Sequence, residues 1–315
     1  MSTDKTIPYL SEEMLAGLDI STTDVIESIE ALIIGCEKGS VWSAPKAVIL
    51  PEDGRYMMAA LAAADAPPFL AVKTVILNPR NPDKNLPQIN GLVTMLDSDS
   101  GLPVAILDGN WVTAVRTAGL SAVAAKYMAR KDSSVAAFIG CGVQAKSHLK
   151  AFKDMFPLDK VRVFGRGRAN IDSLCELAQN MSLDPIVCAS GEEAINDADL
   201  IVSSVTYSAD LVPFLDANCL MPGSFAAITD LGAPWNKETF SAFNRLAIDD
   251  LNQEAALPNK LAPQEYVSGD LSGLVLGKFC GRDDKQDRTA LIFRGHALGD
   301  LALSALAFQK SQGAR

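Results

Sequence analysis

Two cationic side chains stand alone inside apolar stretches of the sequence. Lys73 lies in the run Phe69-Leu-Ala-Val-Lys-Thr-Val-Ile-Leu77, and Arg116 lies in Trp111-Val-Thr-Ala-Val-Arg-Thr-Ala-Gly-Leu120. A charge among apolar neighbours is costly unless it is paired. Because a guanidinium can hold a carboxylate through two hydrogen bonds and an ammonium adds a point charge, these residues predict a carboxylate clamp. Snorkelling or a structural ion pair is the alternative interpretation.

A carboxylate follows another apolar run. Asp230 comes directly after Phe225-Ala-Ala-Ile-Thr229 and before Leu231-Gly-Ala-Pro234. In an open parallel sheet, the carboxyl ends of the strands face the ligand crevice. We therefore expect Asp230 at such an edge, with a loop-capping aspartate as the alternative.

A glycine-rich turn supplies the third signal. The strand-like run Val135–Ile139 leads into Gly140-Cys-Gly-Val-Gln-Ala145, a helical pattern follows, and Val161–Phe164 reads as the next strand. This context makes a match to the dinucleotide-binding pattern G-x-G-x-x-G/A credible. Gly140 would form the tight turn, and Gly142 would let the backbone approach a pyrophosphate at the helix N-terminus. A tight turn that binds nothing is the alternative.

The composition bounds the kind of protein that carries these residues. The chain has 315 residues, 48% of them hydrophobic and 21% charged, which predicts a globular protein of two domains. Its net charge of −10 argues against nucleic acid or an anionic membrane as a partner. Six scattered cysteines without a C-x-x-C pair, and only two histidines, argue against a zinc site and predict a reducing compartment.

The sequence also predicts a cytoplasmic protein. The segment MSTDKTIPYL lacks the basic and apolar regions of a signal peptide. The longest apolar stretch, residues 57–72, is broken by Asp65, Pro67 and Pro68 and is too short to span a bilayer.

The elements before residue 110 predict an α+β region rich in antiparallel pairing. A capped amphipathic helix begins near Asp24 and ends near Gly39. Strand patterns follow at residues 46–50, 56–60, 70–77, 91–96 and 103–108, separated by turn-forming residues.

The elements after residue 110 predict a doubly wound parallel sheet. An alanine-rich helix over residues 112–130 connects the two regions, and strands and helices then alternate to residue 248. Residues 254–286 read as loop and short helix. The apolar helix 296–308 is expected to return to the first domain or to a subunit interface. The expected domains are 1–115 plus 296–315 for substrate binding and dimerisation, and 116–295 for dinucleotide binding.

Taken together, the motifs resemble the ornithine cyclodeaminase/μ-crystallin family. The matching stretches cover about residues 40–305, in the family's order. They are Val72-Lys-Thr-Val75, Asn81-Pro82, Leu86-Pro87, Gly101-Leu-Pro-Val-Ala-Ile-Leu-Asp-Gly109, Val112-Thr-Ala-Val-Arg-Thr-Ala118, Ile139-Gly-Cys-Gly-Val-Gln-Ala145, Leu200-Ile-Val-Ser-Ser-Val-Thr206, Met221-Pro-Gly-Ser224 and Thr229-Asp230.

The resemblance implies a Rossmann domain inserted in a substrate-binding and dimerisation domain built from both chain ends, and a homodimer. It implies that Lys73 and Arg116 contact a substrate carboxylate, and that Asp230 relays a proton or stabilises a protonated imine. It implies NAD(H) or NADP(H) as cofactor. The positions expected to contact the dinucleotide are Arg116, Thr117, Gly140, Gly142, Val143, Gln144, Arg166, Val205, Thr206 and Asp230.

Three departures from the family pattern bear on the substrate. Lys46 stands where the family often has an arginine, so it keeps the charge and loses the bidentate fork. The turn after Asp230 lacks the Cys-Pro-Gly-Lys-like sequence of cyclodeaminases, which puts ornithine cyclisation in doubt. Arg294 and His296 replace apolar or small residues of the family's C-terminal segment. His296 is a candidate substrate contact, with a buried structural histidine as the alternative.

The residues after the second strand bear on the choice of dinucleotide. Phe164-Gly-Arg-Gly-Arg168 carries no acid to hold a ribose 2′-hydroxyl, whereas Arg166 and Arg168 could accommodate a 2′-phosphate. This favours NADP(H) slightly, but an arginine here can also stack on adenine, so NAD(H) stays open.

The expected function is therefore an NAD(P)H-dependent imine reductase that forms an L-amino acid from a small anionic imino acid. Lys46, Arg55 and Arg294 exceed what one carboxylate requires, so a dicarboxylic imine is favoured first, with iminosuccinate reduced to L-aspartate. The alternatives are a cyclic ketimine reductase, an ornithine cyclodeaminase, or a μ-crystallin-like protein that binds nucleotide and a small ligand.

Overall fold

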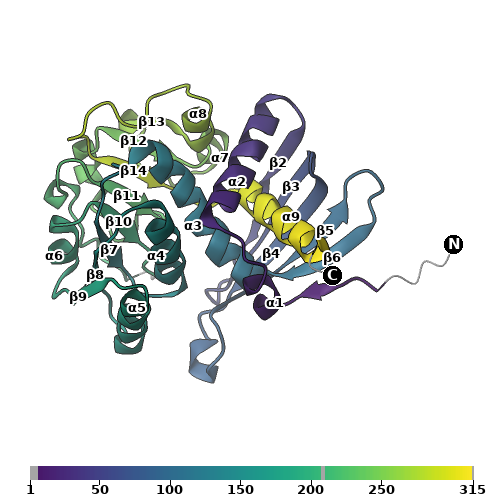
Figure 1. The fold of residues 1–315 in the computed structure, drawn as a ribbon, viewed down its shortest axis with the longest axis horizontal. Helices are drawn as coiled ribbons and strands as arrows, with labels where there is room; N and C mark the ends of the chain where they lie inside the picture. The colour runs from purple at the N-terminus through teal and green to yellow at the C-terminus, as the bar shows by residue number, and fades with distance from the viewer. Residues whose placement is uncertain (1–5, 207–209, 314–315) are drawn as a thin grey trace. The chain divides into compact units, whose positions relative to one another are not determined.

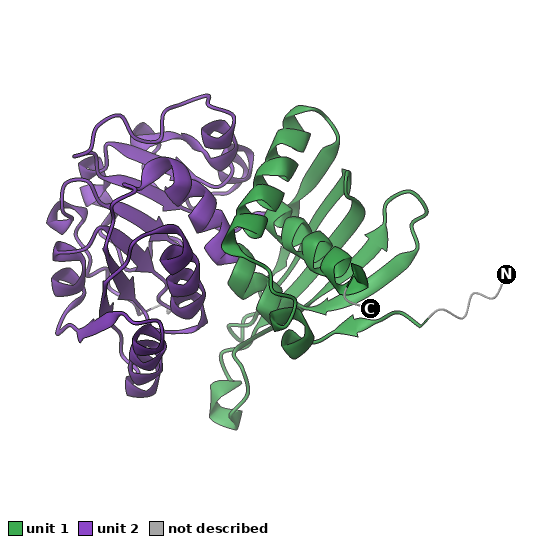
Figure 2. Cartoon of the chain, viewed as in Figure 1, with its two compact units in different colours: residues 1–116, 297–315 green, residues 117–296 purple. Residues whose placement is uncertain are grey.

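The computed structural model describes residues 6–206 and 210–313. The chain divides into two compact units (Figures 1 and 2). Unit 1 consists of Met1–Arg116 and Ala297–Arg315, and unit 2 of Thr117–His296. Helix α3 (Gly109–Met128) runs from the first into the second. Within the described residues, none of the six cysteines forms a disulfide.

Unit 1 is built on a six-stranded sheet with the order β1-β6-β5-β4-β3-β2. Its strands are β1 (Tyr9–Leu10), β2 (Val41–Ile49), β3 (Tyr56–Asp65), β4 (Pro68–Leu77), β5 (Ile89–Asp97) and β6 (Pro103–Asp108). Pairing from β2 to β6 is antiparallel, as the sequence predicted. The short strand β1, which the sequence analysis missed, pairs in parallel with β6.

Two helices from opposite ends of the chain cover one face of this sheet. Helix α2 (Thr22–Glu37) begins at Ser21 with a capping box that Asp24 completes. Helix α9 (Ala297–Gly313) packs against α2 and against strands β3 and β4. The return of the C-terminal helix to the first part of the chain agrees with its nearly all-apolar sequence. The short helix α1 (Glu12–Ala16) and a 3₁₀ turn (Pro82–Lys84) complete unit 1.

Unit 2 is built on an eight-stranded, wholly parallel sheet with the order β13-β12-β14-β11-β10-β7-β8-β9. Its strands are β7 (Val135–Ile139), β8 (Lys160–Phe164), β9 (Asp184–Val187), β10 (Leu200–Ser203), β11 (Phe225–Ile228), β12 (Arg245–Ile248), β13 (Val267–Asp270) and β14 (Thr289–Ile292). This is the predicted doubly wound α/β arrangement.

The helices of unit 2 alternate with its strands. They are α4 (Val143–Met155), α5 (Arg168–Asn180), α6 (Gly191–Asn196), α7 (Leu251–Ala256) and α8 (Leu271–Val275), with 3₁₀ turns at Ala217–Cys219, Lys237–Ala242 and Gln264–Tyr266. Strand order reverses between β7 and β10. Ligands of such sheets bind beside the carboxyl ends of the strands at this switch point. The turn after β7 and the segment after β10 therefore lie where a ligand is expected.

Candidate active site

Unit 1 gathers the two lone cations of the sequence around one carboxylate. Lys73, on β4, is fully buried, and its Nζ lies 2.6 Å from Oδ1 of Asp300 on α9. Arg116 Nε lies 3.0 Å from the same oxygen. Lys73 also donates to the Thr113 hydroxyl at 3.4 Å. We call Lys73, Arg116 and Asp300 the cation cluster.

The cation cluster holds more positive than negative charge. Burial and the Arg116 guanidinium lower the pKa of Lys73 to about 7, against the opposing effect of the Asp300 carboxylate. Burial opposes ionisation of Asp300, but Arg116 and Lys73 outweigh it and hold the pKa of Asp300 below its usual range. Lys46 on β2 adds a further positive field at both side chains. The cluster is therefore suited to receive an anion.

Arg116 has hydrogen-bonding capacity to spare. Its side chain is only 7% exposed, and within the described residues its buried Nη1 meets no hydrogen-bond acceptor. Nε is in ion-pair contact with Asp300 without making a hydrogen bond. A buried donor without an acceptor is costly, so these nitrogens have donor capacity that an oxygen of a ligand can use.

Two other predicted substrate contacts have different partners. Arg55 follows the turn between β2 and β3, where its Nε lies 2.9 Å from Asp53 Oδ2. Arg80 contacts the same carboxylate at 3.0 Å. Arg294, in unit 2, contacts Glu254 Oε2 at 3.0 Å and also donates to the carbonyl of Asn259. The structure thus gives both Arg55 and Arg294 a carboxylate of the protein itself.

In unit 2, Asp230 lies just past the carboxyl end of β11. Its Oδ1 accepts a hydrogen bond from the Ser203 hydroxyl at 3.1 Å, and its Oδ2 accepts one from the Val205 backbone N–H at 3.0 Å. Ser203 is the last residue of β10, the strand that pairs with β11, and Val205 follows two residues later. The indole N–H of Trp235 donates to the same Ser203 hydroxyl oxygen at 2.9 Å. We call these four residues the Asp230 network.

Burial dominates the acidity of Asp230. It raises the pKa of the carboxyl to about 6, although the Val205 N–H and the Ser203 hydroxyl favour the charged form. The principal causes of the shift include no charged side chain. A carboxyl group tuned in this way can hold or release a proton near neutral pH.

The glycine-rich turn has the geometry that a phosphate site needs. Gly140 has φ +90°, and a Cβ there would lie 2.7 Å from the Ser204 carbonyl, so the end of β7 tolerates only glycine. A Cβ at Gly142 would meet no protein atom within 4 Å in the described residues. Gly142 is the N-cap of α4, and no side chain caps this helix. Its first N–H groups therefore suit an anion, while Val143, its first residue, is 66% exposed.

The remaining predicted dinucleotide contacts are spread over unit 2. Gln144 follows Val143 on α4, and Thr206 is exposed beyond β10. Thr117 is buried on α3. Arg166 is exposed in the turn after β8, whereas Arg168 pairs with Asp172 at 2.9 Å.

His296 has a partner within unit 2. Its Nε2 lies 3.3 Å from Oδ2 of Asp250, the residue that caps α7. The pairing holds the pKa of Asp250 below its usual range, although burial alone would raise it. The structure thus pairs His296 with Asp250, whereas the sequence predicted that His296 contacts the substrate.

Three residues of the cation cluster and the Asp230 network were not predicted from the sequence. Asp300 is a single charge in the apolar segment Ala297-Leu-Gly-Asp-Leu-Ala302, the same signal that marked Lys73 and Arg116. Ser203 and Trp235 carry no comparable signal, because a serine after a strand and a tryptophan in a loop are common in any fold.

Two absences concern the described residues only. Across residues 6–206 and 210–313, no group of three or more His, Cys, Asp and Glu side chains is arranged to hold a metal ion. Over the same ranges, no helix has the length and apolar character needed to cross a membrane.

Comparison with known proteins gives consistent matches along the chain. The sequence profile of the ornithine cyclodeaminase/mu-crystallin family matches residues 10–313. The chain is 30% identical over 257 residues to the ketimine reductase mu-crystallin of Mus musculus, with 79% of each chain covered. It is 26% identical over 317 residues to the alanine dehydrogenase of Archaeoglobus fulgidus, with 96% of this chain and 94% of the relative covered.

The fold has a solved counterpart with bound ligands. The Delta(1)-pyrroline-2-carboxylate reductase of Thermococcus litoralis, in complex with NADH and L-proline, superposes with a TM-score of 0.89. The two chains are 25% identical, and 98% of each is covered.

Proposed function

The chain belongs to the ornithine cyclodeaminase/μ-crystallin family, and from this premise we propose that it is an NAD(P)H-dependent reductase of a 2-imino acid. The relatives named above include a ketimine reductase, an alanine dehydrogenase and a pyrroline-2-carboxylate reductase. These oxidoreductases share chemistry at a carbon–nitrogen bond. The product would be an L-amino acid.

The charge of the cation cluster carries this proposal. Lys73 and Arg116 face one carboxylate, Asp300, so one positive charge is left over in a buried position while Lys73 is protonated. One substrate carboxylate would neutralise it and would satisfy the buried Nη1 of Arg116. Every 2-imino acid carries such a carboxylate next to its reacting carbon.

Asp230 is proposed to manage the proton. Reduction of C=N adds a hydride to carbon and a proton to nitrogen. With a pKa of about 6, Asp230 is able to give up a proton and to recover it from solvent at physiological pH. The Val205 N–H and the Ser203 hydroxyl fix both oxygens of the carboxyl group, so that it holds one orientation through the cycle.

The residues of unit 2 fit a nicotinamide dinucleotide. When bound, NAD(P)H supplies the hydride. Gly140 and Gly142 leave room for the pyrophosphate, and the uncapped start of α4 offers it N–H donors. Arg166 is exposed after β8, where the adenosine ribose lies in this fold, and it is compatible with a 2′-phosphate.

A monocarboxylic imine fits the structure better than the dicarboxylic imine first favoured from the sequence. The case for iminosuccinate relied on Lys46, Arg55 and Arg294 as additional cations. Arg55 and Arg294 are paired with Asp53 and Glu254, so only Lys46 supports that case. A cyclic ketimine such as pyrroline-2-carboxylate, with one carboxylate, is therefore proposed first and iminosuccinate second.

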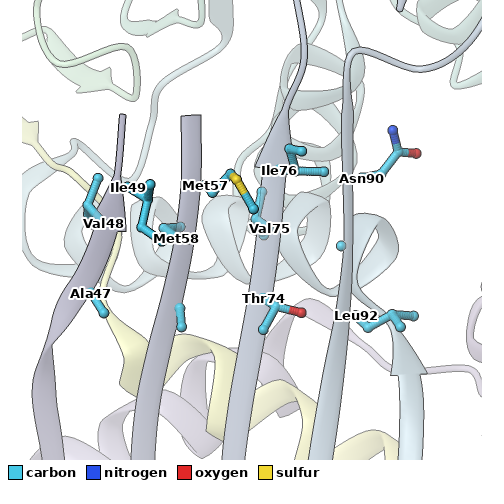
Figure 3. A pocket seen from close by; sticks show the side chains of 12 residues that line it. Ala47, Val48, Ile49, Met57, Met58, Thr74, Val75, Ile76, Asn90 and Leu92 are labelled. Carbon is cyan, nitrogen blue, oxygen red and sulfur yellow. The ribbon is translucent and has the colours of Figure 1, made fainter. Parts of the chain in front are cut away.

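We also propose that the protein is a homodimer joined through unit 1. The sheet face opposite α2 and α9 is open, and Figure 3 shows the side chains of β2 to β5 that line a hollow of about 660 Å³ there. Met57, Leu61 and Leu92 are 37–44% exposed on these strands. A contiguous apolar face suits a second copy of the same surface. Sedimentation analysis of the wild type and of Leu92→Lys tests this, and a monomeric wild type would contradict it.

A substrate panel tests the proposed activity. NADH and NADPH oxidation is followed with pyrroline-2-carboxylate, with pyruvate plus methylamine, and with oxaloacetate plus ammonia. Turnover of the cyclic imine at the highest kcat/KM supports the proposal, and turnover of only the dicarboxylic imine restores iminosuccinate. Ammonia release from ornithine without net NADH change would identify a cyclodeaminase. Binding of dinucleotide without turnover of any of these would identify a binding protein.

A further inference from the structure

We propose that Trp235 is a positioning residue for Asp230, acting through the Ser203 hydroxyl. The inference rests on the proposed role of Asp230, and it concerns a residue in the turn whose sequence departs from that of cyclodeaminases. All three side chains belong to unit 2.

The polarity of the hydrogen bonds follows from the chemistry of the groups. An indole N–H can only donate, so in the 2.9 Å contact the Ser203 oxygen is the acceptor. The single hydroxyl hydrogen of Ser203 is then directed to Asp230 Oδ1, 3.1 Å away. Accepting one hydrogen bond also polarises a hydroxyl, which makes it a stronger donor. Trp235 therefore holds Ser203 in the orientation that stabilises the ionised carboxylate.

The loop after β11 is folded so that Trp235 can make this contact. The backbone N–H of Ala233 donates to the backbone carbonyl of Asp230 at 3.1 Å, and the backbone N–H of Trp235 donates to that of Gly232 at 3.1 Å. Leu231 adopts φ +60° and Gly232 φ +72°. A positive φ costs free energy at a leucine, so the surrounding contacts must hold the turn in place.

Packing then fixes the indole ring. Trp235 is 1% exposed, and its ring contacts those of Phe240 and Phe243 at centroid distances of 6.4 and 6.3 Å. Trp235 also forms an isolated parallel bridge with Leu215. Ser203 is itself fully buried, so water does not compete for its hydroxyl. The hydrogen bond from Trp235 to Ser203 therefore joins two buried side chains.

The other groups around Asp230 do not explain its acidity by charge. From β10 it receives the Ser203 hydroxyl and the Val205 N–H, and from its own loop the peptide N–H groups of Asp230 and Gly232. The principal causes of its pKa shift include no charged side chain from these elements or from β14, the other neighbour of β11. Any change in the Ser203 hydrogen bond should therefore be visible in the titration of Asp230.

The first test needs no substrate. The full-length chain has three tryptophans, so its indole ¹⁵N–¹H spectrum is simple, and Trp235→Phe identifies the Trp235 signal. We expect this signal to titrate with the same midpoint as the Asp230 carboxyl carbon, and to stop titrating in Asp230→Asn. A Trp235 signal that stays constant while the Asp230 carboxyl titrates would overturn the proposal.

The second test uses paired variants. Trp235→Phe keeps the ring and removes the donor, so we expect the pKa of Asp230, read from carboxyl ¹³C shifts and from the pH profile, to rise by about 0.5–1. Ser203→Ala should raise it at least as much, and Trp235→Phe should add nothing in that background. Phe243→Leu alters the same aromatic group without removing a hydrogen bond, and should leave the pKa unchanged.

These readouts separate the two proposals. If no imine is reduced but the Trp235 indole signal titrates together with the Asp230 carboxyl, the proposed function fails and the positioning role of Trp235 stands. If imines are reduced and Trp235→Phe leaves the Asp230 titration unchanged, the positioning role of Trp235 fails and the proposed function stands. Should Trp235→Phe fail to fold, Trp42→Phe and Trp111→Phe identify the Trp235 signal by elimination, and its wild-type titration still decides the question.

Discussion

The cation cluster of unit 1 and the Asp230 network of unit 2 shift the pKa of a buried carboxyl group in opposite directions. In the cluster, Lys73 and Arg116 lie 2.6 and 3.0 Å from one oxygen of Asp300, and these cations keep the carboxylate charged. In the network, one carboxyl group is held by neutral donors, and burial raises its pKa to about 6.

The difference teaches what each region is built to do. A carboxylate locked between cations does not exchange protons near neutral pH, but the cluster it completes attracts an anion. A carboxyl group whose pKa is raised to about 6 by burial exchanges its proton near that pH. Under the proposed function, binding and proton transfer fall to different residues, which can be tested by changing each region alone.

The largest expected effect comes from removing the proton donor. Asp230→Asn keeps the shape of the side chain but accepts only one of the two hydrogen bonds from Val205 and Ser203, and it cannot supply a proton. We therefore expect kcat to fall by about 10²–10⁴-fold with little change in KM. Steady-state kinetics with pyrroline-2-carboxylate measures both. Asp172→Asn, at the exposed pair with Arg168, is the matched control and should be silent. A rise in KM with an unchanged kcat would instead assign Asp230 to substrate binding.

The next effect is on the stability of the cluster. Asp300→Asn leaves two buried cations without a counter-charge, and we expect a loss of about 3–5 kcal/mol in the free energy of unfolding. Asp53→Asn removes the partner of Arg55 at the surface and should leave the free energy of unfolding nearly unchanged. Denaturant unfolding compares the two variants. Similar losses would mean that the cluster is not the buried charge site described above.

A smaller effect separates the charge of the cluster from its geometry. Arg116→Lys keeps the charge and removes the planar fork, so we expect KM for the imino acid to rise by about 10-fold while kcat changes less. Lys126→Arg, at the C-terminal end of the same helix, is the control for a cation exchange. A fall in kcat at constant KM would instead place Arg116 in the chemical step.

The smallest expected effect concerns the dinucleotide. Arg166→Ala should raise KM for NADPH by about 3–10-fold and leave KM for NADH nearly unchanged, because only NADPH carries a phosphate on the ribose. Initial rates with each cofactor at saturating imine measure this. Equal changes for both cofactors would mean that Arg166 stacks on adenine and does not read the phosphate.

The sequence predicted the main elements of both regions, because their periodic patterns and turn residues agree with the final fold. The parallel sheet followed from alternation of strands and helices, and helix 296–308 was expected from its apolar run. Strands β1, β13 and β14 were missed. Each is too short for a pattern: β1 has two residues, β13 reads Val-Ser-Gly-Asp, and β14 reads Thr-Ala-Leu-Ile. Such strands exist because neighbouring strands offer them unpaired backbone groups.

The candidate site was predictable where a charge interrupts an apolar run. Lys73 and Arg116 were recognised in this way, and Asp300 has the same signal within its helix. The pairing of all three could not be predicted, because it joins strand β4, helix α3 and helix α9 across more than two hundred residues. The Trp235–Ser203 contact depends on the conformation of the turn after Asp230, which local sequence does not determine.

The pH profile of kcat/KM for imine reduction, measured for the wild type beside Asp230→Asn, tests the division of labour most directly. Reduction needs Asp230 protonated and Lys73 charged, so both requirements fail as the pH rises. The wild-type profile should fall tenfold per pH unit above about 6 and more steeply above about 7, where Lys73 loses its proton. Asp230→Asn should retain only the upper step. A lower step that persists in Asp230→Asn would contradict the assignment of the proton to Asp230.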